Sequence, residues 1–261
     1  GCPFHNENTP SFTVTPSKGI YKCFGCGEGG NGIISYYMKR KGLNYPEAIR
    51  EAANDFGIAV EEDDSQQSQE EMQRQSRLET LFEINERALA AWQKNTIPQE
   101  FIRYDIVDEF ELAYAPDSWD FLKTELKDVA PGTLHSLGLL SHKPEKNHYY
   151  DFWRNRLIFP IRDTRGRLVA FGGQYLSHDK DELKKFGKYV NSKETELYQK
   201  EQILFGLNQA KGQIRQLGFA YVTEGYWDVA ACHHNGHINT VAPCGTALTI
   251  EQIRLLKKYT M

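Results

Sequence analysis

The spacing of four metal-binding side chains near the start of the sequence constrains the fold more than any other feature. Cys2 and His5 are separated by two residues, and Cys23 and Cys26 form a second pair with the same gap. Zinc prefers four soft or borderline ligands in a tetrahedron, and a gap of two residues lets one turn present both members of a pair. The alternative, buried free cysteines beside an incidental histidine, leaves the paired spacing unexplained. The pattern therefore predicts one structural zinc ion with every coordination position filled by protein.

The cysteine distribution and the charge narrow the classes of protein further. Three of the five cysteines fall in the first thirty residues, which favours metal binding in a reducing compartment over a disulfide scaffold. The net charge of -4 argues against a uniformly basic nucleic-acid coat but allows a local basic groove. No apolar run approaches the roughly 18 residues that a membrane span needs, so no membrane partner is expected. The sequence starts without methionine and ends as abruptly, and we expect a fragment at both ends.

Composition and hydrophobic periodicity divide the sequence into a compact domain, a polar linker, a basic subdomain and the start of an α/β subdomain. Their expected ranges are 1–58, 59–77, 78–217 and 218–261. The linker is assigned because its residues are polar and charged with almost no apolar content. In the compact domain we expect one helix over 32–40 and another after Asn44, with Gly57 as its stop.

The basic subdomain is expected to open with a helix over about 78–94 and to contain a β-hairpin. Two apolar runs, 157–161 and 168–171, flank a short turn, which is typical of such a hairpin. Residues 188–200 follow as a polar loop with alternating basic and aromatic side chains. Residues 151–200 hold eleven Lys and Arg against seven Asp and Glu, a local basic excess in an acidic chain.

The last 44 residues show an alternation of strands and helices. We expect a short buried strand over 219–222, a helix over 226–235 and a second strand over 238–242. A further helix begins at Thr249, because Thr249 and Gln252 have the spacing of a capping box. Strands that alternate with helices predict a parallel sheet.

The segments CPFHNENTPSF and YKCFGCGEGGNGIISY closely resemble the zinc-binding domain of bacterial replicative (DnaG-type) primases. The resemblance implies a ribbon-like β-sheet that contacts single-stranded template. It carries the zinc ligands over to Cys2, His5, Cys23 and Cys26. Candidate DNA contacts are the aromatic residues Phe12, Tyr21 and Phe24 and the cations Lys18, Lys22, Lys39, Arg40 and Lys41. Core packing for the aromatic rings, and a solvated face for the cations, are equally good explanations.

The segments FWRNRLIFPIRDTRGRLVAFGG and KYVNSKETELYQK resemble the catalytic core of the same primases. The resemblance implies that this region binds incoming ribonucleoside triphosphates and the template. The positions that match are Lys188, Tyr189, Asn191, Ser192 and Lys200, with Arg156 and Arg162 as further candidates. An exposed charged loop is the alternative. Two departures stand out: Gln174 replaces the arginine usual after F-G-G, and residues 95–104 show no clear counterpart of an arginine-bearing segment found upstream in the family.

The segments YVTEGYWDVAA and VAPCGTALT resemble the start of the toprim fold. Glu224 is expected where a strand ends and a helix begins, the usual place for active-site residues in α/β folds. The resemblance makes Glu224 a catalytic acidic residue and implies that Asp228, one helical turn later, helps to bind Mg²⁺ or Mn²⁺. In isolation the same motif would describe only a capped helix. The family's paired aspartates are expected on a strand beyond Met261.

The resemblance therefore implies an α+β zinc ribbon followed by an α/β toprim-containing core, incomplete at its C-terminus, of a DNA primase. Such an enzyme is a DNA-directed RNA polymerase that makes short primers on single-stranded DNA, in the bacterial cytoplasm at the replication fork. Its partners would include ribonucleoside triphosphates and a replicative helicase, bound through a domain beyond residue 261. We expect the 261 residues alone to make no primer.

Two alternatives remain open. A non-catalytic zinc-ribbon protein with a degenerate toprim domain would bind single-stranded DNA only. A topoisomerase-type toprim enzyme would need a nucleophilic tyrosine in a separate domain. The order of the motifs, with the zinc pairs first and toprim after the basic core, favours the primase.

Overall fold

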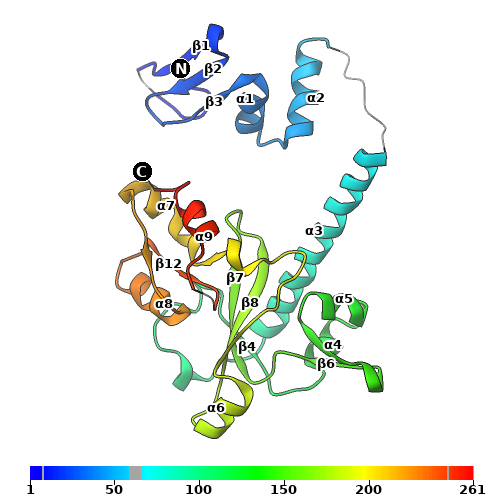
Figure 1. The fold of residues 1–261 in the computed structure, drawn as a ribbon. Helices are drawn as coiled ribbons and strands as arrows, with labels where there is room; N and C mark the ends of the chain where they lie inside the picture. Colours follow the sequence, from blue (N-terminus) through cyan, green and yellow to red (C-terminus); the bar gives the residue numbers. More distant parts are fainter. Residues whose placement is uncertain (8, 59–65, 246, 261) are drawn as a thin grey trace. The chain divides into compact units, whose positions relative to one another are not determined.

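The computed structural model describes residues 1–7, 9–58, 66–245 and 247–260 of the chain (Figure 1). The chain forms two compact units, Gly1–Gln69 and Glu70–Met261. Seven of the nineteen residues of the expected polar linker, 59–65, lie outside the described residues, and the other twelve, 66–77, are helical. Among the described helices, none combines the length and the apolar character needed to cross a membrane.

The first unit is a three-stranded antiparallel sheet followed by two helices. Its strands pair in the order β1-β2-β3, and the elements are β1 (Phe12–Thr15), β2 (Ile20–Cys23), β3 (Gly29–Asn31), α1 (Gly32–Lys41) and α2 (Tyr45–Asp55). A short 3-10 helix, Pro16–Lys18, connects the first two strands. The sheet is the ribbon that the sequence resemblance implied, and both expected helices are confirmed.

Helix α2 begins where it does because Asn44 and Glu47 cap each other. The Asn44 side chain accepts from the Glu47 backbone N–H at 3.0 Å, and the Glu47 carboxylate accepts from the Asn44 N–H at 2.8 Å. These two bonds satisfy donors that the first turn of a helix leaves unpaired. Ala48 and Ala52 then bury one face of α2 against Tyr37 of α1.

The long helix α3 (Gln66–Gln93), most of which belongs to the second unit, begins twelve residues before the expected start at Leu78. The additional turns are rich in Gln, Glu, Arg and Met, which have high helix propensity, so a polar composition does not prevent helix formation here. The helix precedes a four-stranded antiparallel sheet in the order β4-β7-β8-β9, made of β4 (Ala113–Ala115), β7 (Arg156–Arg162), β8 (Leu168–Tyr175) and β9 (Tyr189–Asn191). The β7–β8 hairpin is as expected, whereas β9 is a strand within the expected polar loop.

Smaller elements surround this sheet. They are the 3-10 helices Gln99–Phe101, Pro144–Lys146 and Lys200–Gln202, the helices α4 (Phe121–Glu125), α5 (Pro131–Ser136) and α6 (Lys180–Phe186), and the strands β5 (Leu140–Lys143) and β6 (His148–Asp151). Strands β5 and β6 pair with each other as a separate antiparallel hairpin.

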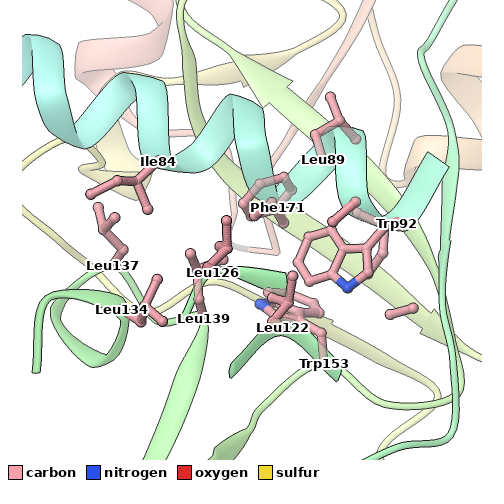
Figure 2. Packing of buried hydrophobic residues seen from close by; sticks show 14 of the residues in the cluster. Ile84, Leu89, Trp92, Leu122, Leu126, Leu134, Leu137, Leu139, Trp153 and Phe171 are labelled. Carbon is pink, nitrogen blue, oxygen red and sulfur yellow. The ribbon is translucent and has the colours of Figure 1, made fainter. Parts of the chain in front are cut away.

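One hydrophobic core of the second unit lies between α3 and the sheet (Figure 2). Trp92 of α3 is fully buried and meets Phe171 of β8 edge-to-face, with ring centroids 5.0 Å apart. Leu122 and Leu134, from α4 and α5, complete the same cluster. Burial of large apolar side chains on this scale stabilises a fold by about 1.5–3 kcal/mol for each residue, so α3 is anchored mainly by this face.

The C-terminal part of the second unit is a small mixed sheet with helices. Its strand order is β10-β12-β11, and the elements are β10 (Leu204–Phe205), α7 (Leu207–Leu217), β11 (Tyr221–Val222), α8 (Tyr226–His234), β12 (Thr240–Pro243) and α9 (Ile250–Leu256). Strands β11 and β12 are parallel as predicted, but β10 joins β12 antiparallel. The expectation that the β11 segment is buried is wrong. Among the described strands β11 pairs only with β12, and Tyr221 and Val222 are 48% and 41% exposed.

Candidate zinc centre and active-site cavity

The first unit brings Cys2, His5, Cys23 and Cys26 together. Their sulfur and nitrogen atoms all lie within 4.8 Å of one another. The Cys2 and Cys26 sulfurs are 3.9 Å apart, and the Cys23 sulfur is 3.9 Å from His5 Nδ1. Zinc bonds of roughly 2.0–2.3 Å in a tetrahedron place ligand atoms about 3.5 Å apart. The four residues therefore fit a single zinc ion.

Ser11 and Glu7 hold these ligands in place. The Ser11 hydroxyl donates to the Glu7 carboxylate, lies 3.2 Å from the Cys23 sulfur and accepts from the Gly25 N–H at 3.1 Å. His5 Nε2 lies 3.7 Å from the same carboxylate, which leaves Nδ1 facing the sulfurs. A carboxylate behind a histidine fixes the orientation of its ring. A side chain at Gly25 would place a Cβ only 2.6 Å from the Ser11 oxygen, so this turn needs glycine.

Cys23 is prepared for metal binding by its surroundings. Burial raises the pKa of its thiol, but the polar Ser11 hydroxyl beside the sulfur and the backbone N–H groups of Cys26 and Gly25 outweigh this and lower the pKa to about 6. The thiolate is the form that binds zinc. The hydrogen bond from Ser11 likewise lowers the pKa of Glu7, so its carboxylate stays charged behind His5.

The candidate DNA contacts of this unit differ in solvent exposure and in whether they are already paired with another side chain. Tyr21 is 6% exposed and packs against Phe4, so it belongs to the core. Phe24 is 72% exposed, and the ammonium of Lys22 lies 5.5 Å from its ring. Lys39 is paired with an acidic side chain of the same unit, as is Lys41. Phe24 and Lys22 are thus the pair best placed to stack on a base and meet a phosphate.

In the second unit, a cavity of about 340 Å³ gathers several of the predicted site residues. Its lining includes Arg103, Tyr189, Asn191, Glu224, Gly225, Tyr226, Trp227, Asp228, Pro243 and Gly245. Glu224 lies between β11 and α8, and Asp228 lies in the first turn of α8; both are exposed. One carboxylate oxygen of Asp228 accepts from the Gly225 N–H at 3.1 Å, so Asp228 also caps the helix.

The unexpected strand β9 positions the 188–191 segment at this cavity. Its pairing with β8 sets Tyr189 opposite Gln174 and Asn191 opposite Gly172. Burial raises the pKa of Tyr226, so its hydroxyl stays protonated and donates to the Asn191 side-chain oxygen. Lys188 is exposed, with its ammonium 5.6 Å from the Tyr189 ring.

Lys200 lies in the 3-10 helix Lys200–Gln202 and is partly buried. Its carbonyl accepts from the Gln252 side chain at 2.9 Å, which ties this segment to α9. Ser192 is also structural in its contacts, because its hydroxyl accepts from the Phe171 N–H at 3.0 Å and the side chain is buried. A nucleotide-binding role for Lys200 stays a prediction.

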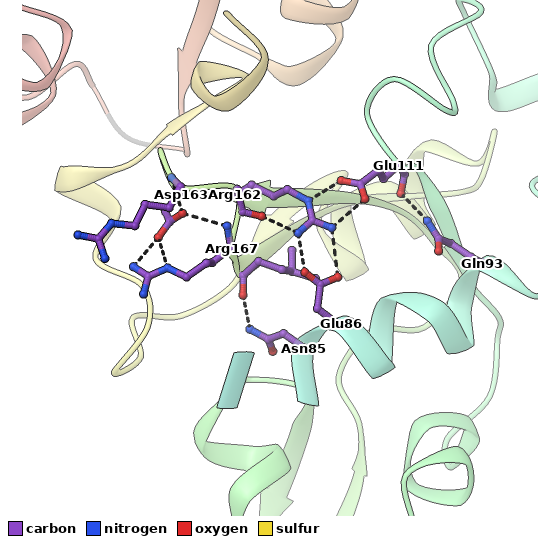
Figure 3. A network of polar contacts seen from close by, with 10 residues as sticks. Asn85, Glu86, Gln93, Glu111, Arg162, Asp163 and Arg167 are labelled. Carbon is purple, nitrogen blue, oxygen red and sulfur yellow. Dashed lines mark hydrogen bonds and ion pairs between the residues drawn. The ribbon is translucent and has the colours of Figure 1, made fainter. Parts of the chain in front are cut away.

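Arg156 and Arg162 are both engaged by the protein itself. Arg156 is 6% exposed, donates to the carbonyls of Phe186 and Gly187, and has its pKa lowered to about 10 by burial. Arg162 donates to the carboxylates of Glu86 and Glu111 (Figure 3). The geometry gives both arginines a structural task, and their predicted nucleotide contacts gain no support from it.

Arg103 is a cavity residue that the sequence analysis did not identify. It is exposed, and its guanidinium carbon lies 5.4 Å from the centroid of the Trp227 ring. Within the described ranges it has no ion pair with an acidic side chain. The sequence does contain a sign of this residue. The family carries an arginine-bearing segment in this region, and Arg103 is the only arginine in residues 95–104.

A second group missed from the sequence lies on the surface around the β5–β6 hairpin. Trp119 is 58% exposed, and the Arg154 guanidinium carbon lies 3.9 Å from the centroid of its ring. Arg154 also lies 5.5 Å from the Tyr150 ring, and the Lys143 ammonium lies 5.4 Å from that ring. Exposed aromatic faces beside cations are typical of surfaces that bind single-stranded nucleic acid.

Comparison with known proteins agrees with this arrangement. Residues 1–68 match the CHC2 zinc finger, residues 93–211 the N-terminal domain of the DNA primase catalytic core, and residues 218–261 the Toprim domain. The chain is 37% identical to the DNA primase of Pseudomonas putida, in an alignment that covers 98% of this chain and 39% of that protein. It thus spans about two fifths of the length of that relative.

Solved structures show the same likeness. The crystal structure of the Aquifex aeolicus primase, with its zinc-binding and RNA polymerase domains, is 34% identical with a TM-score of 0.61, over 99% of this chain and 62% of that one. A DnaG primase catalytic domain bound to single-stranded DNA is 29% identical with a TM-score of 0.62, over 71% and 62% of the two chains.

The fold and the sites define a zinc-finger protein that carries a toprim-containing catalytic core. The zinc ligands, the primase core and the toprim segment occur in the order of the family, and together they account for nearly the whole sequence. The chain belongs to the family of bacterial DnaG-type DNA primases.

Proposed function

We propose that this chain serves the synthesis of short RNA primers on single-stranded DNA during replication. The observation that carries the proposal is the cavity that holds Glu224 and Asp228 together with Arg103 and Asn191. Nucleotidyl transfer needs acidic groups to hold a divalent cation and basic groups to hold phosphates. This cavity offers both beside a polar amide that can contact a sugar or base.

Glu224 and Asp228 are the residues that would hold Mg²⁺ or Mn²⁺. Both carboxylates are exposed at the start of α8, and oxygen ligands of this kind suit a hard cation. The bound ion would neutralise charge on the triphosphate and favour attack by the primer hydroxyl. Arg103 and Lys188 would hold phosphate oxygens, since neither has an acidic partner among the described residues.

The template is proposed to contact two surfaces. Trp119, Arg154 and Tyr150 form one in the second unit, and Phe24 with Lys22 forms another in the zinc ribbon. The related catalytic domain bound to single-stranded DNA supports a nucleic-acid role for the core. We also propose a cytoplasmic location at the bacterial replication fork and a replicative helicase as partner, both of which follow from the proposed activity.

A primer-synthesis assay tests the proposal. The complete gene product that contains this chain should extend ribonucleotides on a single-stranded template with Mg²⁺, and Glu224→Gln in that protein should abolish synthesis. Glu251→Gln is the matched control, because Glu251 is an exposed glutamate on α9 whose one ion pair in the described part of the chain is with Arg254 of the same helix. Template binding without any synthesis would instead establish the non-catalytic alternative.

A further inference from the structure

Gln174, where related primases usually carry arginine, organises two aromatic residues of the cavity. It lies near the end of β8 and is 6% exposed. Its side-chain oxygen accepts from the Trp227 indole N–H at 2.6 Å and from the Tyr189 hydroxyl at 3.3 Å. A single amide oxygen thus satisfies two aromatic donors from different elements, α8 and β9.

Only an acceptor can perform this task. An arginine side chain has five donors and no acceptor, so at position 174 it would leave the Trp227 N–H without a partner. Trp227 is 5% exposed, and a buried donor that loses its partner destabilises the fold. Gln174 and Trp227 therefore depend on each other, and the missing arginine is explained by the tryptophan rather than by loss of the site.

Both aromatic residues line the cavity together with Arg103. The Trp227 ring lies 5.4 Å from the guanidinium carbon, within the range of cation–π attraction. Burial raises the pKa of Tyr189, the charge of Arg103 lowers it, and the charge of Asp228 raises it again. Tyr189, Arg103 and Asp228 line the same cavity, and Arg103 has no acidic partner in the described ranges.

We propose that Gln174 is a positioning residue which, through Trp227, holds the Arg103 guanidinium at the cavity to bind a phosphate group. The arginine that the family carries after F-G-G is replaced in this chain by a cation from a different segment. The phosphate belongs either to a nucleoside triphosphate or to the nucleic-acid backbone. The inference rests on the proposed function, because it assigns a ligand to the same cavity.

A double-mutant cycle in the 261-residue chain tests this coupling. The probes are a fluorescent ATP analogue with Mg²⁺ and a fluorescein-labelled oligo-dT, which separate the two sources of phosphate. Arg103→Gln should weaken binding of one or both probes about tenfold, the effect of losing one charge-assisted hydrogen bond. For oligo-dT it should also lower the salt slope by about 0.7.

Gln174→Leu should weaken the same probe about three- to tenfold when Arg103 is present, and should have no effect in the Arg103→Gln background, because coupled residues are not additive. Gln216→Leu is the matched control, an exposed glutamine at the end of α7 that should change nothing. If Gln174→Leu fails to fold in a thermal melt, Trp227→Phe replaces it in the cycle. This change removes the indole N–H that donates to Gln174 and keeps an aromatic ring, and it should show the same dependence on Arg103.

The outcomes separate the inference from the proposed function. If the Arg103→Gln and Gln174→Leu variants lose binding of the ATP analogue alone, the phosphate belongs to the triphosphate. If they lose binding of oligo-dT alone, it belongs to the template. Either result supports the coupling. Equal weakening by Gln174→Leu with and without Arg103, or no weakening at all, overturns the inference while the proposed function stands. A wild-type chain that binds neither probe overturns both.

Discussion

Replacement of Arg162 by methionine tests whether this arginine stabilises the fold or binds a nucleotide. The side chain of Arg162 is 13% exposed and bridges Glu86 of α3 to Glu111 at 2.5 Å each, and it also donates to the Gly166 carbonyl at 2.8 Å (Figure 3). Glu111 has a φ of 53°, in the left-handed region that a non-glycine residue seldom adopts. Arg162 thus ties a strained loop and the long helix to the central hairpin.

The cost of Arg162→Met can be worked from these contacts. The carboxylates of Glu86 and Glu111 are 46% and 38% exposed, so solvent screening limits each ion pair to about 0.5–1 kcal/mol. The lost hydrogen bond to the Gly166 carbonyl adds about 1 kcal/mol, and methionine keeps most of the apolar stem. We expect the second unit to lose about 2–3 kcal/mol, which lowers Tm by roughly 5–10 °C for a unit of this size.

Tryptophan fluorescence during thermal or urea unfolding measures this loss selectively. The chain has four tryptophans, at positions 92, 119, 153 and 227, and all lie in the second unit. Arg165→Met is the control, because Arg165 is an exposed arginine on the same turn. We expect nucleotide binding by the folded variant to be unchanged. An unaltered Tm together with weakened nucleotide binding would refute the structural reading of Arg162 and restore its predicted ligand role.

Three further predictions concern the zinc, the cavity and pH. Cys23→Ala should lose the one zinc equivalent and unfold residues 1–58, since metal binding and folding are linked, while tryptophan fluorescence stays unchanged; retained zinc would contradict the ligand assignment. Lys188→Ala should weaken binding of oligo-dT or nucleotide about threefold to tenfold in a salt-dependent manner, measured by fluorescence anisotropy. Burial raises the pKa of Asp151 above 3.8, so its contribution to stability falls as pH rises through the folded pKa. Asp151→Asn should therefore be less destabilising at pH 7 than at pH 4 in urea unfolding.

Much of the fold follows from local sequence signals. The Asn44–Glu47 and Thr249–Gln252 capping boxes both form as the spacing predicts. These helix starts are predictable because both residues of each capping box lie within three positions of each other. Strand β9 shows the limit: its three residues form a strand only because β8 pairs with them, and a polar loop of the same composition has no internal sign of that partner. The exposed position of β11 likewise depends on which strands neighbour it.

The candidate site likewise contains residues that local motifs predict and residues that depend on distant partners. The zinc ligands come from two short motifs, and Glu224 and Asp228 come from one, so both groups are recognisable in sequence. The role of Gln174 is different, because its partner Trp227 lies 53 residues further along the chain. The sequence shows only that no arginine stands there, and the structure supplies the tryptophan that requires an acceptor.

Partner side chains, rather than charge alone, decide which cations of this chain can serve a phosphate. A phosphate must displace whatever already holds the cation, and the net gain falls by the strength of those bonds. Arg162 would have to leave two carboxylates, and Arg156 would have to leave the carbonyls of Phe186 and Gly187, to which it donates while buried. Among the described residues, Arg103 has the face of Trp227 and no acidic partner, which leaves its donors free for a ligand. A guanidinium that is held by a ring and has no acidic partner loses little on binding. Arg103, although it is the least apparent of these cations in the sequence, is therefore well placed to bind a phosphate at this cavity.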